Sequence, residues 1–268
     1  SVKSKNFNRV WPFVVSSSTQ GFIDESRHNC SRKADISRIS PNAMPSQNLC
    51  RVVWLGEIGY LDARQLQLSL VEKVHSGQDS NTMLMLEHPH VYTKGRLSNE
   101  SDILVPEEEL TANGIPVYET DRGGQITYHG PGQLVVYPIV NIRSWGGPIK
   151  YVRALEQVII GTLAEMSITA THESGNTGVW TDQGKIAAVG VKISRGIAFH
   201  GLALNVNTDL AYYQNIIPCG IADRPVTSMA AILGKQIDMK LVRNRLSYQF
   251  GQEFGFRMED GGHKSISI

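Results

Sequence analysis

Three strands in succession, with no helix between them, constrain the fold of this 268-residue chain most strongly. Within residues 168–206, strand-like runs occur near 177–181, 185–193 and 197–206, separated only by short polar turns. Successive strands joined by short turns pair antiparallel, because a parallel pair needs a long crossover connection. Strand and helix signals alternate elsewhere in the chain. The sequence therefore predicts an α/β (α+β) fold with a mixed, largely antiparallel sheet flanked by helices.

The remaining elements are predicted from apolar periodicity and from cap residues. Leu66, Leu70 and Val74 recur at a spacing of four and indicate a helix over 61–76. A proline followed by three glutamates at 106–109 marks the start of a second helix. Further helices are expected at 149–167, 226–233 and 238–254, the last with Leu241, Leu246 and Phe250 inward, and strands at 51–55, 82–86, 115–119, 125–129 and 133–141.

Composition narrows the class of protein. The formal net charge is +1, which gives no argument for a nucleic-acid or membrane partner. No apolar run approaches the ~20 residues of a membrane span. Three cysteines without CxxC pairs or metal-ligand spacing fit free thiols in a reducing compartment. We expect a soluble protein that contains no metal and binds neither nucleic acid nor membrane.

The first 43 residues differ from the rest of the chain. They contain nine serines, seven Lys/Arg, three Asp/Glu and no sustained periodicity, so a disordered extension is expected there. An overlong start, with Met44 as the true first residue, is favoured over an organellar transit peptide, because the acidic residues dilute the transit signature. A folded domain is expected at 44–258 and a disordered tail at 259–268. The expected location is cytoplasmic; a genuine transit peptide would imply a mitochondrion or plastid.

Two glycine-rich blocks have the composition of a binding site. Residues 122–133, Arg-Gly-Gly-Gln-Ile-Thr-Tyr-His-Gly-Pro-Gly-Gln, combine four glycines with side chains that donate hydrogen bonds. Glycine lets a ligand approach bare backbone, so the block suits a loop around an elongated substrate. A tight hairpin with mutually satisfied polar groups is the alternative. The second block, Gly-Lys-Ile-Ala-Ala-Val-Gly at 184–190, precedes Phe-His-Gly-Leu-Ala-Leu-Asn-Val at 199–206.

A single cysteine, Cys219, lies between a proline and a glycine downstream of both blocks. Such a turn would expose the sulfur, and a cysteine attacks as its thiolate, which a nearby ammonium favours. Lys185 is the candidate ammonium. The alternatives are a buried, inert cysteine and a lysine that reaches the surface. His129 and His200 offer a competing Cys–His scheme.

Together these motifs resemble the LipB family, the lipoyl(octanoyl) transferases, over about residues 51–255. The motifs are the block at 122–133, the segment 184–193 with its continuation to 207, and Ile-Pro-Cys-Gly at 217–220. The resemblance implies the fold of biotin and lipoate protein ligases, with Cys219 as acyl-thioester nucleophile and Lys185 lowering its pKa. It implies an octanoyl site formed by Arg122, Gly123, Gly124, Gln125, Ile126, Thr127, Tyr128, His129, Ala188, Val189, Gly190, Gly201, Leu202 and Ala203.

The resemblance also implies a reaction without cofactor, ATP or metal. Octanoyl-acyl carrier protein would donate its acyl group to Cys219, which would pass it to a lysine on lipoyl domains of 2-oxoacid dehydrogenases or glycine cleavage H protein. The alternatives are an ATP-dependent lipoate or biotin protein ligase and a non-catalytic binder of lipoyl domains. Because both Cys219 and Lys185 are present, the enzyme is favoured. We also expect Gly201→Val to obstruct acyl binding more than folding.

Overall fold

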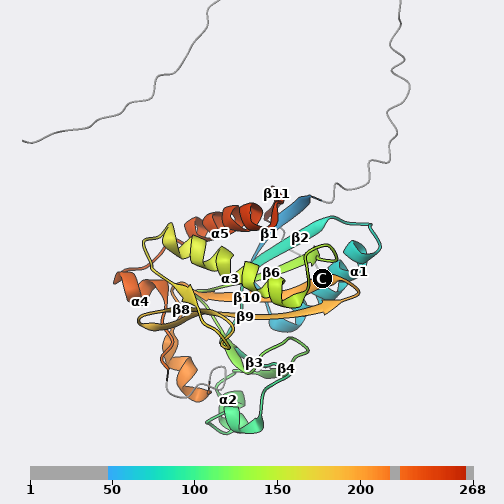
Figure 1. Ribbon diagram of the computed structural model, residues 1–268. Coiled ribbons are helices and arrows are strands. Elements are labelled where there is room, and N and C mark those ends of the chain that lie inside the picture. The colour runs from blue at the N-terminus through green and yellow to red at the C-terminus, as the bar shows by residue number, and fades with distance from the viewer. Residues whose placement is uncertain (1–47, 218–223, 264–268) are drawn as a thin grey trace, which may run out of the picture. The chain divides into compact units, whose positions relative to one another are not determined.

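The computed structural model describes residues 48–217 and 224–263, which form a large and a small sheet with flanking helices (Figure 1). The large sheet comprises β1 (Leu49–Glu57), β2 (Asn81–Glu87), β6 (Gln133–Asn141), β7 (Thr171–His172), β8 (Val179–Thr181), β9 (Gly184–Ser194), β10 (Ile197–Asn205) and β11 (Arg257–His263). Its strand order is β11-β1-β2-β6-β10-β9-β8-β7. β1 pairs parallel with β11 and β2, and all other neighbours pair antiparallel. The predicted mixed, largely antiparallel sheet is thus confirmed.

Helices cover both faces of the large sheet. They are α1 (Tyr60–His75), α3 (Pro148–Ala164), α4 (Met229–Leu233) and α5 (Met239–Phe254), whereas α2 (Glu107–Ala112) packs against the small sheet. Side chains of α3 and α5 share one hydrophobic cluster with the sheet, and side chains of α1 share another with its opposite face. Because both faces are covered, every residue of β10 is buried. This double burial explains why the central strands have nearly continuous apolar sequences.

The small sheet carries the first glycine-rich block. It consists of β3 (Val91–Lys94), β4 (Val117–Glu119) and β5 (Thr127–His129), in the order β4-β3-β5. Two 3-10 helices, η1 (Glu100–Asp102) and η2 (Leu210–Asn215), complete the described elements. A separate core, which includes Tyr92, Leu110 and Tyr128, holds this sheet to α2 and η2. The small sheet therefore has its own packing beside the large one.

Two predictions at the C-terminal end were wrong. Residues 259–263, predicted to be part of a disordered tail, belong to β11, which pairs with β1. The sequence of β11 lacks apolar alternation, so only its backbone pairing with a distant strand reveals it. Leu241 is 39% exposed, whereas the adjacent Val242 is fully buried. The buried stripe of α5 starts at Val242 and continues through Leu246 and Phe250 at a spacing of four.

Strand β10 departs from regular geometry at His200. Its φ is 55°, a left-handed conformation that residues other than glycine rarely adopt. The β6–β10 register places it opposite Pro138, which has no N–H to donate, and the registered pairing stops at Ala198 and resumes at Leu202. The His200 N–H instead donates to Gln67 Oε1 of α1 at 2.8 Å. The irregularity thus joins α1 to the centre of the sheet.

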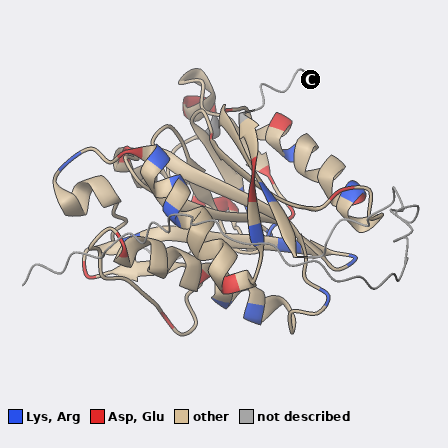
Figure 2. Ribbon diagram, turned by 90° about the horizontal axis from the view of Figure 1, so that it is seen from above, with Lys and Arg blue, Asp and Glu red and all other residues tan. Residues whose placement is uncertain are grey.

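Figure 2 shows Lys/Arg and Asp/Glu positions on helices and strands alike. Within the described part of the chain, no helix combines the length and apolarity that a membrane crossing requires.

Candidate active site

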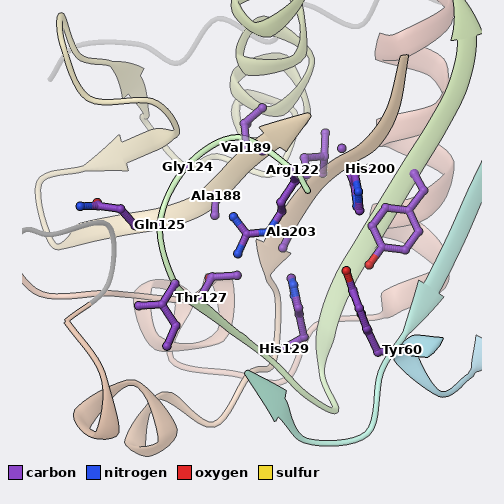
Figure 3. A pocket seen from close by; sticks show the side chains of 15 residues that line it. Tyr60, Arg122, Gly124, Gln125, Thr127, His129, Ala188, Val189, His200 and Ala203 are labelled. Atoms are coloured by element: carbon purple, nitrogen blue, oxygen red, sulfur yellow. The ribbon is translucent and has the colours of Figure 1, made fainter. Parts of the chain in front are cut away.

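A pocket lies between β9, β10 and the loop that joins β4 to β5 (Figure 3). We call residues 120–126 the glycine loop and this space the glycine-loop pocket. Pairing of β9 with β10 aligns residues 188–190 with residues 201–203, so the two predicted strand segments form one wall. About 500 Å³ of space lies between these elements, part of it open to solvent. Its lining is Tyr60, Arg122, Gly124, Gln125, Ile126, Thr127, His129, Tyr137, Ala188, Val189, Gly190, His200, Gly201, Leu202 and Ala203.

All the residues predicted to bind the octanoyl group line this pocket, except Gly123 and Tyr128. The Gly123 N–H donates to Val191 O at 3.0 Å, so this residue ties the glycine loop to β9. Tyr128 points to the other side of β5, because side chains alternate along a strand. It packs there in the core of the small sheet, while Thr127 and His129 face the pocket.

Arg122 reaches from the glycine loop into the pocket (Figure 3). Its buried guanidinium donates to Gly123 O at 3.0 Å, and to Thr93 O and Oγ1 at 2.6 and 2.9 Å. A Cβ at Gly190 would lie 2.8 Å from Gly123 O and 3.2 Å from Arg122 Cδ. Glycine at 190 therefore allows the loop and its arginine to lie directly on β9.

Lys185 lies in an adjoining pocket, which we call the Lys185 pocket. This space shares Thr127 and Ala188 with the glycine-loop pocket. The ammonium Nζ donates to Thr177 O at 3.0 Å and lies 5.1 Å from the centroid of the Trp180 ring. Only 6% of Lys185 is exposed, which excludes the alternative of a surface lysine. The two blocks thus bring the buried Lys185 next to a pocket with one apolar wall, formed by residues 188–190 and 201–203.

A family model of the lipoyl protein ligase A/B catalytic domain matches residues 59–251. The chain belongs to this family. The octanoyltransferase of Alkaliphilus metalliredigens is 47% identical over 207 residues, which cover 76% of this chain and 95% of that protein. The octanoyltransferase of Solibacter usitatus is 46% identical over 79% of this chain and 96% of its own. The resemblance to LipB is thereby confirmed.

Solved structures support the family fold. A lipoate-protein ligase A bound with ATP has a TM-score of 0.64 at 16% identity, covering 81% of this chain and 90% of that one. A putative lipoate protein ligase from Thermoplasma acidophilum with bound lipoic acid has a TM-score of 0.62 at 15% identity, with the same coverage. At these identities the likeness concerns the fold alone.

In this family member, the predicted nucleophile lies outside the described residues. Cys219 is within the stretch 218–223, but the segment that follows is described. Lys185 N–H donates to Pro225 O, and Thr227 N–H donates to Lys185 O, both at 2.9 Å. Val226 lines the Lys185 pocket. The chain therefore lies against Lys185 within a few residues after Cys219.

Sequence reasoning did not place Tyr60, Tyr137 or His200 in the lining of the pocket. Tyr60 is the first residue of α1, and burial raises the pKa of its phenol to about 12. Burial also raises the pKa of the Tyr137 phenol, which donates to His88 Nε2 at 2.8 Å. His200 lies on β10 directly before the predicted Gly201, whereas Tyr60 and Tyr137 come from elements outside the glycine-rich blocks. Only the tertiary packing of α1 and β6 against the loop brings them into the site.

Two buried histidines beside the pocket are neutral. His88 Nδ1–H donates to Ile58 O at 2.7 Å, and burial lowers the pKa of the ring to about 4. His129 Nδ1–H donates to Gln133 Oε1 at 2.7 Å, and burial lowers its pKa to about 3. Because a group with so low a pKa is a weak base at neutral pH, the structure argues against His129 as the activator of a thiol.

The neutral histidines predict a loss of stability in mild acid. Between pH 6.5 and 4 the unfolded chain binds a proton on His88 that the folded chain excludes. The free energy of unfolding should fall by about 1.4 kcal/mol per pH unit for each such histidine. Urea unfolding at several pH values measures this slope. His88→Gln keeps a donor for Ile58 and an acceptor for Tyr137 but cannot titrate, so its slope should be shallower; an unchanged slope would contradict the assignment.

The expectation for Gly201→Val was wrong, because the glycine is required by the sheet. A Cβ at this position would lie 2.2 Å from Val136 O and 2.7 Å from Pro138 Cδ. Gly201→Ala is therefore expected to lower the free energy of unfolding by about 1–3 kcal/mol, as measured by urea unfolding. Gly123→Ala is the control, since its Cβ would meet only Val191 O at 3.4 Å. Equal stability of the two variants would refute the steric argument.

Proposed function

We propose that this octanoyltransferase carries the octanoyl group on Cys219 before it delivers the group to a lysine of a lipoyl domain. Curated octanoyltransferases at about 45% identity, aligned over most of the chain, support octanoyl transfer as the reaction. The covalent step is supported by one observation, which is that the glycine-loop pocket and the Lys185 pocket adjoin each other. One has an apolar wall from β9 and β10 that suits an acyl chain, and the other contains the buried Lys185 ammonium.

In the first half-reaction, the Cys219 thiolate attacks the carbonyl carbon of the octanoyl thioester. A new C–S bond forms and the C–S bond to the carrier breaks, and the carrier sulfur leaves as a thiol with a proton given up by the Lys185 ammonium. The Lys185 ammonium would stabilise the thiolate before attack, because an adjacent positive charge favours the ionised sulfur. Octanoyl-acyl carrier protein is the proposed donor.

In the second half-reaction, the ε-amine of the acceptor lysine attacks the acyl-Cys219 carbonyl. A C–N bond forms, the C–S bond breaks, and the amine loses a proton as the amide is made. Once deprotonated, Lys185 would accept that proton and return to the ammonium. The proposed acceptors are lipoyl domains of 2-oxoacid dehydrogenases and glycine cleavage H protein. Thioester exchange followed by amide formation needs no nucleotide.

Intact-mass spectrometry tests the covalent step directly. After mixing with octanoyl-acyl carrier protein in the absence of ATP, the protein should gain the mass of one octanoyl group, and peptide mapping should place it on Cys219. Addition of an unmodified lipoyl domain should transfer that mass to the domain. Acylation of the domain only when free octanoate and ATP are supplied would instead establish the ATP-dependent ligase. A lipoyl domain that binds but gains no mass would establish the non-catalytic binder.

A further inference from the structure

The glycine loop belongs to one sheet but lines a pocket formed by the other. It connects β4 to β5 of the small sheet, and β9 and β10 of the large sheet form the facing wall. The pocket therefore exists only while the loop stays against β9 and β10. The backbone hydrogen bond from Gly123 to Val191 is one tie between them. A side chain at the start of the loop supplies a second.

That side chain is Asp121, immediately before Arg122. Its Oδ1 accepts from His200 Nε2 of β10 at 2.8 Å, and its Oδ2 accepts from Lys192 Nζ of β9 at 2.8 Å. Arg64 Nη2 of α1 lies 3.9 Å from Oδ2. One carboxylate from the loop thus contacts three elements of the large-sheet layer. Hydrogen bonds to an ionised acceptor are stronger than neutral ones.

The Asp121 carboxylate is ionised at neutral pH. Burial opposes its ionisation, but the hydrogen bonds and charges of Lys192 and His200 outweigh that effect and lower its pKa to about 2. Lys192 and His200 therefore both donate to an ionised carboxylate. This arrangement favours the closed loop over one in which the donors are unpaired.

His200 is itself part of the pocket wall, and Asp121 fixes its orientation. The ring is 2% exposed and stacks on Phe199 at a centroid distance of 5.0 Å. Regular alternation would place Phe199 and His200 on opposite faces of the sheet, but the left-handed φ of His200 turns both toward the α1 face. The Asp121 carboxylate stabilises this conformation of His200 through its ring, and Gln67 of α1 stabilises it through its backbone N–H.

We propose that Asp121 is a positioning residue that latches the glycine loop over the acyl pocket, through Lys192 and His200. Without the latch, the closed loop is populated less. The apparent affinity for the acyl donor falls by the same fraction, because an open loop does not bind the chain. Turnover of the bound donor changes less, since the bound acyl chain itself keeps the loop closed. The latch acts on the octanoyl transfer proposed above.

The test compares Asp121→Asn with a matched control. Asparagine keeps the shape of the side chain, but its amide NH₂ must face either Lys192 or His200, both of which donate. We expect KM for octanoyl-acyl carrier protein to rise about tenfold or more, with kcat within about threefold. Lys192→Met, which leaves the His200 bond, should show a smaller rise. Asp79→Asn is the control, because Asp79 also accepts from a cationic side chain, that of Arg51 at 3.0 Å, but lines neither pocket.

Hydrogen exchange provides a readout that needs no substrate. In the ligand-free full-length protein, peptides covering 122–126 should exchange several-fold faster in Asp121→Asn than in wild type or Asp79→Asn. An unchanged KM, or an unchanged exchange rate in these peptides, would overturn the latch. A fall in Tm with unchanged KM would make Asp121 merely structural. If the wild type itself fails to transfer the octanoyl group, the proposed function is wrong. The exchange experiment still tests whether Asp121 keeps the glycine loop closed.

Discussion

Cys219→Ser is expected to abolish octanoyl transfer and the covalent adduct. A serine hydroxyl at neutral pH is a far weaker nucleophile than a thiolate, so the loss of kcat should be on the order of 10³-fold or more. Steady-state transfer from octanoyl-acyl carrier protein to a lipoyl domain measures the rate, and intact mass measures the adduct. Octanoate binding to the variant should persist, because the described lining from β9, β10 and the glycine loop would still contact the acyl chain.

Cys50 provides the control for that variant. It is fully buried in the core, and burial raises the pKa of its thiol to about 12, so it is neither accessible nor ionised at neutral pH. Cys50→Ala and Cys30→Ser should therefore keep transfer within a few-fold of wild type. An octanoyl adduct that maps to either of these cysteines would overturn the assignment of the nucleophile.

Lys185→Met should produce the second large effect. The change keeps much of the stem beside Trp180 but removes the charge, so the pH midpoint for iodoacetamide alkylation of Cys219 should rise. Each pH unit of that shift corresponds to about 1.4 kcal/mol of lost preference for the thiolate. Transfer should fall by roughly 10²–10⁴-fold, because both the activating charge and the proton acceptor are lost.

Lys185→Arg separates the two roles of the lysine. Arginine keeps a positive charge that does not act as a base, so alkylation should partly recover while transfer to the incoming amine stays impaired. His129→Ala and His200→Ala are the matched controls for the Cys–His scheme. If the alkylation midpoint stays unchanged in Lys185→Met and rises in a histidine variant, the role assigned to the lysine is wrong.

The elements that the sequence predicted correctly are those with strong local signals. The apolar stripe of α3 and the successive strands β9 and β10 both bury faces that their own periodicity marks. The glycine-rich blocks likewise contain most of the lining of the pocket, because close backbone approach requires glycine locally. For these elements and for the glycine-rich blocks, the local sequence alone was sufficient to predict the structure.

The missed features depend on distant partners. β3 and β11 are strands because of the neighbours with which they pair, since neither has a strong apolar alternation. Tyr60 and Tyr137 enter the pocket from α1 and β6, and no motif links them to the glycine loop. The left-handed φ at His200 occurs opposite Pro138, where the registered pairing of β6 with β10 is interrupted. Such relations are fixed by tertiary packing, which single-sequence patterns do not record.

The pairing of β1 with β11 has a consequence for synthesis in the cell. β1 is the first described strand and β11 the last, so one edge of β1 has no partner until almost the whole domain has left the ribosome. All the other described helices and strands are translated between β1 and β11. An unpaired edge is a template on which strands of other chains can add. The nascent protein is thus most prone to aggregate just before β11 leaves the ribosome, when a long polypeptide is folded around a sheet that still lacks this strand.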